Sequence, residues 1–449
     1  MVGRLIRDRV FLFIYRKFIF IFIILTLNPV DVNSRSIIVD AEIDNLLKEY
    51  AIQLYEVSEL SGDEIEIFII NDSSINAFVT PKGKIYINTG LLIESDFPNQ
   101  VISIIAHEMG HVIHNHHITR RLESESMSKK QIIAQIIGIG AGVSGLISDT
   151  DSLKNIGTGI TLGGTNVATR DFFNYSRQQE YEADMAAIRI MESAEQSSIG
   201  LVEVLNKINA QPHIYADLLN PLDLTHALPE DRINLLKIKI SEQKYFKKVD
   251  SQELMHRHNL MKAKLIGYLG LRNIYPKGTI YYKYVNAISY YQKGKLDLSE
   301  NKMKEIVNIE ETPYFLELLA QIHRDKSEFK KSLEYIEKSL EILIERDPQI
   351  EILYADILIA SNDRENILKG INILESNAYV KIMKPKIHWE LSQAYYEIDN
   401  IPKADLNIAK YYSLIGDANS AKRFSERAKK GLKYSTPDWL AADDIQNIH

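Results

Sequence analysis

The 449-residue chain contains no cysteine, so it can form neither disulfides nor thiolate metal sites. Any bound metal must therefore use histidine and carboxylate ligands. The chain also lacks an excess of positive charge, because its formal net charge is −7, and it has no glycine-rich phosphate-binding loop. These absences argue against nucleic-acid binding. The length is sufficient for two or three domains, each with a hydrophobic core.

The N-terminal segment lacks an apolar run long enough for a clear membrane span. Five basic residues precede position 18, and a ten-residue apolar run, 18–27, follows them. Small residues at 32–34 are suited to a cleavage site. This layout predicts a secretory signal peptide over residues 1–34, and hence export. The alternative is an uncleaved anchor formed by residues 11–27. Without cysteine, a lipoprotein anchor is excluded.

A histidine pair provides the strongest chemical signal in the chain. His107 and His111 lie four residues apart, so on a helix they project from one face. Two imidazoles at this spacing can bind one tetrahedral zinc, and Glu108 between them can take a proton from an attacking water. Apolar residues at helical spacing predict the helix, with Ser95 or Asp96 as its N-cap. The alternative is a chance occurrence of a short pattern on an ordinary helix.

Upstream of this pair the pattern predicts a helix at 39–59 and then a small β-sheet. Alternating isoleucines indicate a strand at 65–70, and the segments 76–80 and 84–88 flank a Pro-Lys-Gly turn as in a hairpin. We expect strand 84–88 to be the sheet edge that pairs with extended substrate. A hairpin that only packs is the alternative. The expected substrate-binding residues are Asn76, Lys84, Ile85, Tyr86 and Ile87.

Two glycine-rich stretches, 131–147 and 156–168, follow the histidine pair. The first is nearly uncharged and shorter than the roughly twenty apolar residues that a membrane span requires. We expect a buried helix with a mobile cover over the site. The alternative is a hairpin that contacts a membrane peripherally.

A third metal ligand is expected downstream, because two histidines leave the metal under-coordinated. Glu180 and Asp184 lie four residues apart in a segment that reads as a helix, so they share one face. Glu180 can bind the metal, and Asp184 can accept the N–H of a ligand histidine. A surface helix with ordinary acidic residues is the alternative. The pattern predicts one zinc per chain, bound by His107, His111 and Glu180.

Taken together, these motifs resemble the HtpX and CAAX-prenyl-protease family of zinc metallopeptidases. The resemblance covers about residues 39–262 and rests on four blocks of sequence. It implies an α+β zincin core of gluzincin type, mostly helical with a small β-sheet, in which Glu108 is the catalytic base. The blocks are Asn76-Ala-Phe, His107-Glu-Met-Gly-His111, the segment 176–184 and the segment 225–232.

The resemblance also implies roles for two residues in the last block. With its predicted export signal and helical-repeat tail, the chain resembles a periplasmic subgroup of this family. In that subgroup the histidine matching His226 can occupy the fourth zinc position and hold the enzyme inactive. The following residue is Ala227, where the family usually has proline. We expect His226 to gate the site or to assist catalysis. Arg232, together with Asp184, is expected to support the ligands without touching the metal.

Small and aromatic residues recur in the C-terminal part at the spacing of tetratricopeptide-type (TPR-like) helical hairpins. The spacing slips between residues 355 and 389, so we predict about four hairpins in an all-α domain; a generic helical domain is the alternative. Such stacks expose a concave surface that suits protein segments. The expected organisation is a signal peptide at 1–34, a zinc metallopeptidase domain at 35–262 and a TPR-like domain at 263–449. The clearest unit contains Ala409, Tyr412, Gly416, Ala421 and Ala428.

Two classes of function stay open. The first is a zinc-dependent endopeptidase of the periplasm that degrades misfolded or stalled envelope proteins and assists outer-membrane β-barrel assembly through its repeats. The second is a chaperone or adaptor with a latent protease site that His226 closes. The partners implied by the resemblance are unfolded or misassembled envelope proteins and the outer-membrane β-barrel assembly machinery. Zincin chemistry alone does not identify the substrate.

Overall fold

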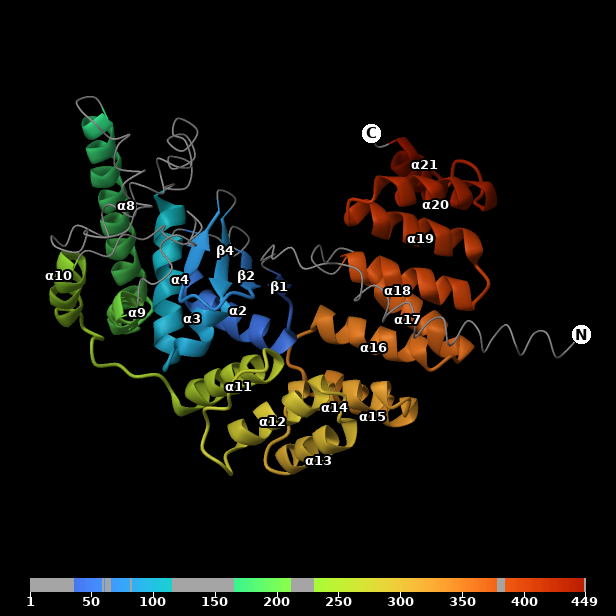
Figure 1. Cartoon of the computed structure of the whole chain (residues 1–449), viewed down its shortest axis with the longest axis horizontal. Helices are drawn as coiled ribbons and strands as arrows, with labels where there is room; N and C mark the ends of the chain where they lie inside the picture. Colours follow the sequence, from blue (N-terminus) through green and yellow to red (C-terminus); the bar gives the residue numbers. More distant parts are fainter. Residues whose placement is uncertain are drawn as a thin grey trace, which may run out of the picture.

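The structure is a computed structural model of the whole chain, viewed in Figure 1. It is mostly helical with one small sheet, as predicted. It describes residues 36–58, 60, 66–80, 83–114, 165–210, 230–377 and 384–447.

A four-stranded sheet lies beside the helices of the N-terminal part (Figure 1). The predicted hairpin is confirmed, because β3 pairs antiparallel with β4. In addition, β2 pairs with β4 in parallel, and β1 pairs antiparallel with β2. The strand order is therefore β1-β2-β4-β3. The strands are β1 (Ile37–Ile38), β2 (Glu66–Ile70), β3 (Ala77–Val79) and β4 (Lys84–Asn88).

The strand β4 is internal, so the prediction that residues 84–88 form the sheet edge is wrong. Its backbone pairs with β2 on one side and with β3 on the other. Turn residues indicate that β3 and β4 are neighbours, but they do not reveal the pairing of β4 with the more distant β2. In the part of the sheet that the structure describes, the edge beside β4 is consequently β3.

Seven helices among the described residues of the N-terminal part share one hydrophobic core with this sheet. The predicted first helix is confirmed as α2, whose N-cap Asp40 accepts a hydrogen bond from the Ile43 N–H at 3.1 Å. The helices are α2 (Ala41–Tyr55), α3 (Thr89–Glu94), α4 (Pro98–Ile113), α8 (Thr165–Ser193), α9 (Ile199–Ala210), α10 (Glu230–Ser241) and α11 (Gln252–Tyr268).

The helix α4 carries the histidine pair, but it begins later than predicted. Its first residue is Pro98, which suits a first turn because proline has no N–H to leave unsatisfied. The cap position holds Phe97, so neither Ser95 nor Asp96 is the N-cap. The short helix α3 ends just before these two residues, and Ser95 is its C-cap.

The C-terminal part consists of consecutive helices joined by short connections, drawn from yellow-orange to red in Figure 1. Its helical character is confirmed, whereas a TPR-type repeat stays a prediction. Helices α16, α17 and α18 occupy the stretch in which the residue spacing loses its period. The helices are α12 (Ile280–Gln292), α13 (Leu296–Val307), α14 (Pro313–Asp325), α15 (Phe329–Ile342), α16 (Pro348–Ala360), α17 (Arg364–Ser376), α18 (Lys384–Glu397), α19 (Ile401–Leu414), α20 (Ala418–Gly431) and α21 (Pro437–Asn447).

The two parts of the chain share the helix α11. Met261 and Leu265 belong to the core around the sheet, whereas Leu260, Ala263 and Ile266 belong to the core formed with α12, α13 and α14. The predicted boundary between residues 262 and 263 falls inside this helix and stays a prediction. The parts are therefore joined by packing and not only by the chain.

A buried ion network strengthens this junction. The Lys264 ammonium lies 2.8 Å from Asp40 and 3.2 Å from Glu42, and its side chain is 3% exposed. Glu42 in turn accepts a hydrogen bond from the Tyr284 hydroxyl on α12 at 2.9 Å. Burial raises the pKa of nearby Asp44 to about 7, although a hydrogen bond from Gln349 opposes the shift. The N-terminus of α2 is thus tied to the C-terminal helices through polar contacts.

Several predictions lie outside the described residues. They concern the signal peptide at 1–34, the stretch 131–147, most of the stretch 156–168, and His226. Among the residues that are described, no helix is both long and apolar enough to cross a membrane.

Candidate metal centre

The helix α4 places the histidine pair and Glu108 inside the protein. His107 and His111 are buried, and their Nε2 atoms lie 3.2 Å apart, which their positions on one helical face allow. Their rings are nearly perpendicular, with an interplanar angle of 89°. Glu108 follows His107 directly and is 1% exposed. A carboxylate and two imidazoles buried at this depth need a reason beyond packing.

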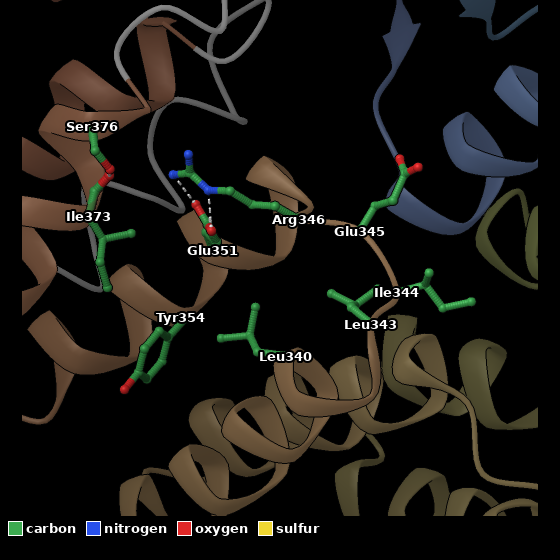
Figure 2. Close-up of a pocket in the computed structure, with 9 residues that line it drawn as sticks. All are labelled: Leu340, Leu343, Ile344, Glu345, Arg346, Glu351, Tyr354, Ile373 and Ser376. Carbon is green, nitrogen blue, oxygen red and sulfur yellow. Dashed lines mark hydrogen bonds and ion pairs between the residues drawn. The ribbon is translucent and has the colours of Figure 1, made fainter.

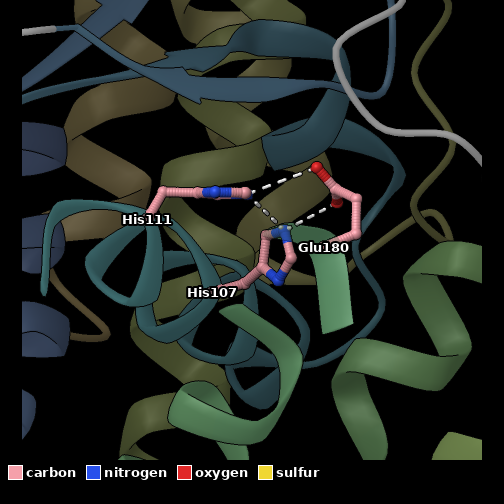
Figure 3. A group of neighbouring side chains, drawn as sticks. All are labelled: His107, His111 and Glu180. Atoms are coloured by element: carbon pink, nitrogen blue, oxygen red, sulfur yellow. Dashed lines mark hydrogen bonds and ion pairs between the residues drawn. The ribbon is translucent and has the colours of Figure 1, made fainter. Parts of the chain in front are cut away.

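Glu180 on α8 completes a three-residue group with the histidines, shown in Figure 3. Its Oε2 lies 3.4 Å from His107 Nε2, and its Oε1 lies 3.5 Å from His111 Nε2. Ligand atoms about 2.0–2.1 Å from a tetrahedral zinc are themselves about 3.3 Å apart. The three side chains therefore fit one zinc ion. The structure brings the predicted ligands together, and their role as ligands stays a prediction.

Gly110 lets α8 approach α4 closely enough to deliver Glu180. A Cβ atom at this position would lie 2.7 Å from the Ala183 carbonyl oxygen and 2.9 Å from the Ala183 Cα. Both contacts are with backbone, so only movement of a helix would relieve them. The glycine lies one residue before His111 and is part of how the site is assembled. The sequence motif alone does not reveal this role.

We expect Gly110→Ala to weaken zinc binding about 10- to 100-fold, the range seen when the support of a metal ligand is lost. The added methyl should push α8, and with it Glu180, away from both histidines. Competition with a chelator measures the zinc affinity. Gly370→Ala on α17 is a matched control, because its Cβ would meet Ile359 and Ala355 far from the site. Equal zinc affinity in Gly110→Ala and wild type would contradict this role.

Asp184 and Arg232 contact members of the three-residue group and position their side chains. Asp184 Oδ1 lies 3.0 Å from His107 Nδ1, so this carboxylate favours the tautomer whose Nε2 lone pair faces Glu180 and His111. Arg232 on α10 donates through Nε and Nη2 to the two oxygens of Asp184, at 2.7 and 2.8 Å. Its Nη1 lies 3.1 Å from Glu180 Oε2. One guanidinium thus positions both acidic side chains.

Electrostatic contacts within the site oppose the effect of burial on the pKa of these groups. Burial alone would raise the pKa of Asp184, but the charge and hydrogen bonds of Arg232, aided by His107, hold that pKa below its usual value. Burial alone would lower the pKa of His107, but Asp184 and Glu180 outweigh it and raise that pKa. The pKa of Arg232 is likewise raised by Asp184 and Glu180 in spite of burial. The opposite charges within this group of side chains therefore offset the cost of burying them.

Comparison with known proteins agrees with this geometry. Residues 39–240 match Peptidase family M48. The predicted family resemblance is therefore confirmed for this part of the chain, which contains the complete three-residue group. Family M48 is a metallopeptidase family, and we refer to residues 39–240 as the M48 region.

Longer alignments extend beyond the M48 region. The chain is 22% identical over 383 residues to the beta-barrel assembly-enhancing protease of Escherichia coli K12, covering 82% of this chain and 74% of that protein. It is 24% identical over 273 residues to the beta-barrel assembly-enhancing protease of Yersinia pestis, covering 57% and 53%. The alignment with the Yersinia protein thus spans about half of that protein's length.

The structure changes the interpretation of the expected substrate-binding residues. The prediction that residues 84–88 bind peptide as an edge is wrong, because this strand is internal. Ile85 and Ile87 are fully buried in the core, whereas Lys84 and Tyr86 lie on the opposite face. Asn76 precedes the edge strand β3, so its contact with substrate stays a prediction. His226 lies outside the described residues.

Anchors at the start of α4 are also part of the site but carry no sequence signature. The Asn99 N–H donates to Asp250 Oδ2 at 3.0 Å, which satisfies a free donor of the first helical turn. The Asn99 side chain donates to the Ser197 carbonyl at 2.7 Å and accepts from the Gly200 N–H at 3.0 Å. These contacts fix the helix that carries both histidines against α9.

A separate cavity of about 370 Å³ lies between α15, α16 and α17, far along the chain from the metal group (Figure 2). Leu340, Leu343 and Ile373 give it an apolar wall. At its rim the Arg346 guanidinium donates to both oxygens of Glu351. No residue of the metal group lines it.

Proposed function

We propose that the protein is a zinc-dependent endopeptidase of the cell envelope that degrades misfolded or stalled proteins. The observation that carries this proposal is the buried convergence of His107, His111 and Glu180 beside Glu108, within a region that matches a metallopeptidase family. This donor set suits zinc, and its side chains come from two helices that pack directly together.

The chain's own groups divide the work of peptide hydrolysis. When bound, zinc would supply Lewis acidity that polarises the scissile carbonyl and the attacking water. Glu108 would accept a proton from that water and pass it to the leaving amine. Asp184 holds the His107 ring, and Arg232 balances the charge of the two acidic side chains.

Among the described strands β3 has a free edge, and this is where we place the substrate backbone. Asn88 N–H donates to the Asn76 carbonyl at 3.0 Å, and Thr80 N–H donates to the Lys84 carbonyl at 2.9 Å. Even-numbered residues of this segment thus bond towards β4. Because the pattern alternates along an antiparallel ladder, the N–H and C=O groups of Ala77 and Val79 point away from the sheet. An extended peptide can pair with them.

Val79→Pro is expected to lower kcat/KM about tenfold, since proline removes one outward N–H without removing a bond inside the sheet, and such a bond contributes about 0.5–1.5 kcal/mol. The measurement is cleavage of a denatured protein such as casein. Val79→Ala is the matched control, because it keeps the N–H and shortens the side chain. If Val79→Pro cleaves as fast as Val79→Ala, the peptide does not bind along β3.

Metal analysis combined with proteolysis tests the proposed function directly. The purified protein should contain one zinc per chain and digest casein, and a chelator should abolish digestion until zinc is restored. Absence of digestion both by the zinc-loaded protein and by its zinc-loaded His226→Ala variant, with the fold intact, would refute the endopeptidase assignment. The remaining interpretation would then be the chaperone or adaptor role.

We also propose that His226 closes the site in the resting enzyme. A fourth protein ligand would leave no open position for water, so the protease would be latent. His226→Ala is then expected to digest casein several-fold faster than wild type at equal zinc content. If it is equally fast or slower, His226 is not a gate, and a role in stabilising the tetrahedral oxyanion would be favoured.

For the cellular role, we propose that the C-terminal helices hold envelope proteins in the periplasm and assist outer-membrane β-barrel assembly. Two kinds of support exist: the names of the matched Escherichia and Yersinia proteins, and a long stack of helices of the kind that binds protein segments. The proposed partners are misassembled envelope proteins and the β-barrel assembly machinery.

A further inference from the structure

Three aromatic rings cross the outer face of the sheet in a row. Phe68 on β2, Tyr86 on β4 and Phe78 on β3 are directly opposite one another in the strand register. The Phe68 and Tyr86 rings lie 5.2 Å apart at 23°, and the Tyr86 and Phe78 rings lie 5.2 Å apart at 13°. We call these three residues the aromatic ladder. The strands β2, β4 and β3 contribute one ring each, and Phe78 is the member at the edge of the described sheet.

The ladder lies on the face opposite the hydrophobic core. Ile69, Ile87 and Ala77 occupy the neighbouring register position and point into the core. All three ladder rings are half-buried. At the far end, the Lys84 ammonium lies 4.9 Å from the Phe68 ring centre and 2.6 Å from the Glu66 carboxylate. The Lys84–Glu66 ion pair therefore flanks the ladder at β2, whereas at β3 the ladder ends at the edge of the sheet.

The backbone pattern determines which substrate residue meets Phe78. Ala77 and Val79 present their N–H and C=O groups to the free edge, whereas Phe78 bonds towards β4. In a peptide added antiparallel to β3, the residue opposite Phe78 therefore forms a non-hydrogen-bonded pair. In such pairs the Cα atoms are about 4.5 Å apart and the side chains are closest. Directly opposite side chains also share one face of the sheet.

The spacing of the ladder also fits a fourth ring. Its rings are 5.2 Å apart, close to the separation of about 4.7–4.9 Å between neighbouring strands. An aromatic side chain on an added strand would repeat that step and stack on Phe78. We propose that the enzyme selects extended peptides with an aromatic side chain at the position facing Phe78. This inference rests on the proposed function, because it assumes a peptide on β3.

Mapping of cleavage sites provides the first test. The zinc-loaded full-length protein is given a mixture of peptides, and products are identified by mass spectrometry. Aromatic residues should be enriched at one fixed position relative to the scissile bond. In a matched pair of peptides, phenylalanine at that position should raise kcat/KM over alanine by about three- to tenfold, the range expected for one stacked aromatic pair.

Variants of the ladder assign the preference to Phe78. Phe78→Leu should bring the phenylalanine-to-alanine ratio close to one, and Phe78→Tyr should restore it because the ring is retained. Phe68→Leu is the control, since it removes a ladder ring of similar burial that β4 and β3 separate from the peptide. This variant should keep the phenylalanine-to-alanine ratio of wild type. Circular dichroism shows whether each variant is folded. An unchanged ratio in folded Phe78→Leu would overturn the inference.

Binding separates this inference from the proposed function. The zinc-loaded Glu108→Gln protein should bind the phenylalanine peptide about three- to tenfold more tightly than the alanine peptide. Equal binding of both peptides would overturn the inference even if wild type is an active protease. Conversely, selective binding without cleavage by wild type or by His226→Ala would support the aromatic site while refuting the endopeptidase.

Discussion

Replacement of Glu108 by glutamine is expected to reduce peptide hydrolysis by about 10²- to 10⁴-fold, the usual contribution of a general base. The amide is nearly the same size as the carboxylate, so the buried site should keep its packing, but an amide cannot accept the proton of the attacking water. Zinc content should stay at one per chain, because Glu108 does not supply any of the three converging ligand atoms. Digestion of casein and elemental analysis measure the two quantities.

The ligand variants give the contrasting pattern. His107→Ala and Glu180→Ala should lose both zinc and activity, since each removes one of three buried donors. If Glu108→Gln loses zinc as they do, Glu108 supports the metal and the base must be sought elsewhere. Activity close to wild type in Glu108→Gln would exclude it as the base.

The second large effect is expected for Arg232→Met. This change leaves Asp184 and Glu180 buried, with side chains 2% exposed, and without their shared cation. Loss of one partner from a buried ion pair costs about 3–5 kcal/mol. The free energy of unfolding of the metal-free protein, measured with urea, should fall by that amount. Added zinc should restore part of it, because a divalent cation compensates the same carboxylates.

Two controls separate charge balance from other effects of the substitution. Lys239→Met lies on the same helix, but its ion pair with Glu242 is exposed, so its loss should change stability by less than about 1 kcal/mol. Arg232→Lys keeps the charge but loses the bidentate contact with Asp184. Its free energy of unfolding should therefore fall by an amount between those of Lys239→Met and Arg232→Met. Stability of Arg232→Met equal to that of Lys239→Met would show that the network is not needed for the fold.

Local spacing predicts the parts of the metal group but not its assembly. The separations of His107 from His111 and of Glu180 from Asp184 are both four residues, and helical geometry alone puts each pair on one face. Nothing in either spacing brings α4 and α8 together. That contact depends on the absence of a side chain at Gly110, which a one-dimensional pattern does not distinguish from an ordinary helical glycine.

The sheet shows the opposite case, in which a correct local pattern leads to a wrong position. Alternation at residues 84–88 indicates a strand with two different faces, and both faces exist: isoleucines in the core and Tyr86 outside. An edge strand and an internal strand produce the same alternation. The parallel pairing with β2 involves residues far from the hairpin turn, so only the folded structure reveals it.

The repeat spacing fails around α16 for a related reason. This helix is buried almost all round, at Ile350 and at every residue from 352 to 359. It contacts helices on several sides, including α14, α15, α17 and α18. A helix without a solvent face has no apolar stripe, so periodicity gives no signal even though the helix is regular.

The sharing of α11 between two hydrophobic cores limits how the distance between the C-terminal helices and the metal group can vary. A flexible linker would let a client bound on the C-terminal helices sample many distances from the metal group, and its local concentration there would depend on linker length. Packing through Leu260 and Leu265, together with the buried Lys264, sets that distance instead. On the proposed function, a client held by the C-terminal helices would be cut only where it has enough unfolded chain to span this distance, and a tightly folded client would be spared.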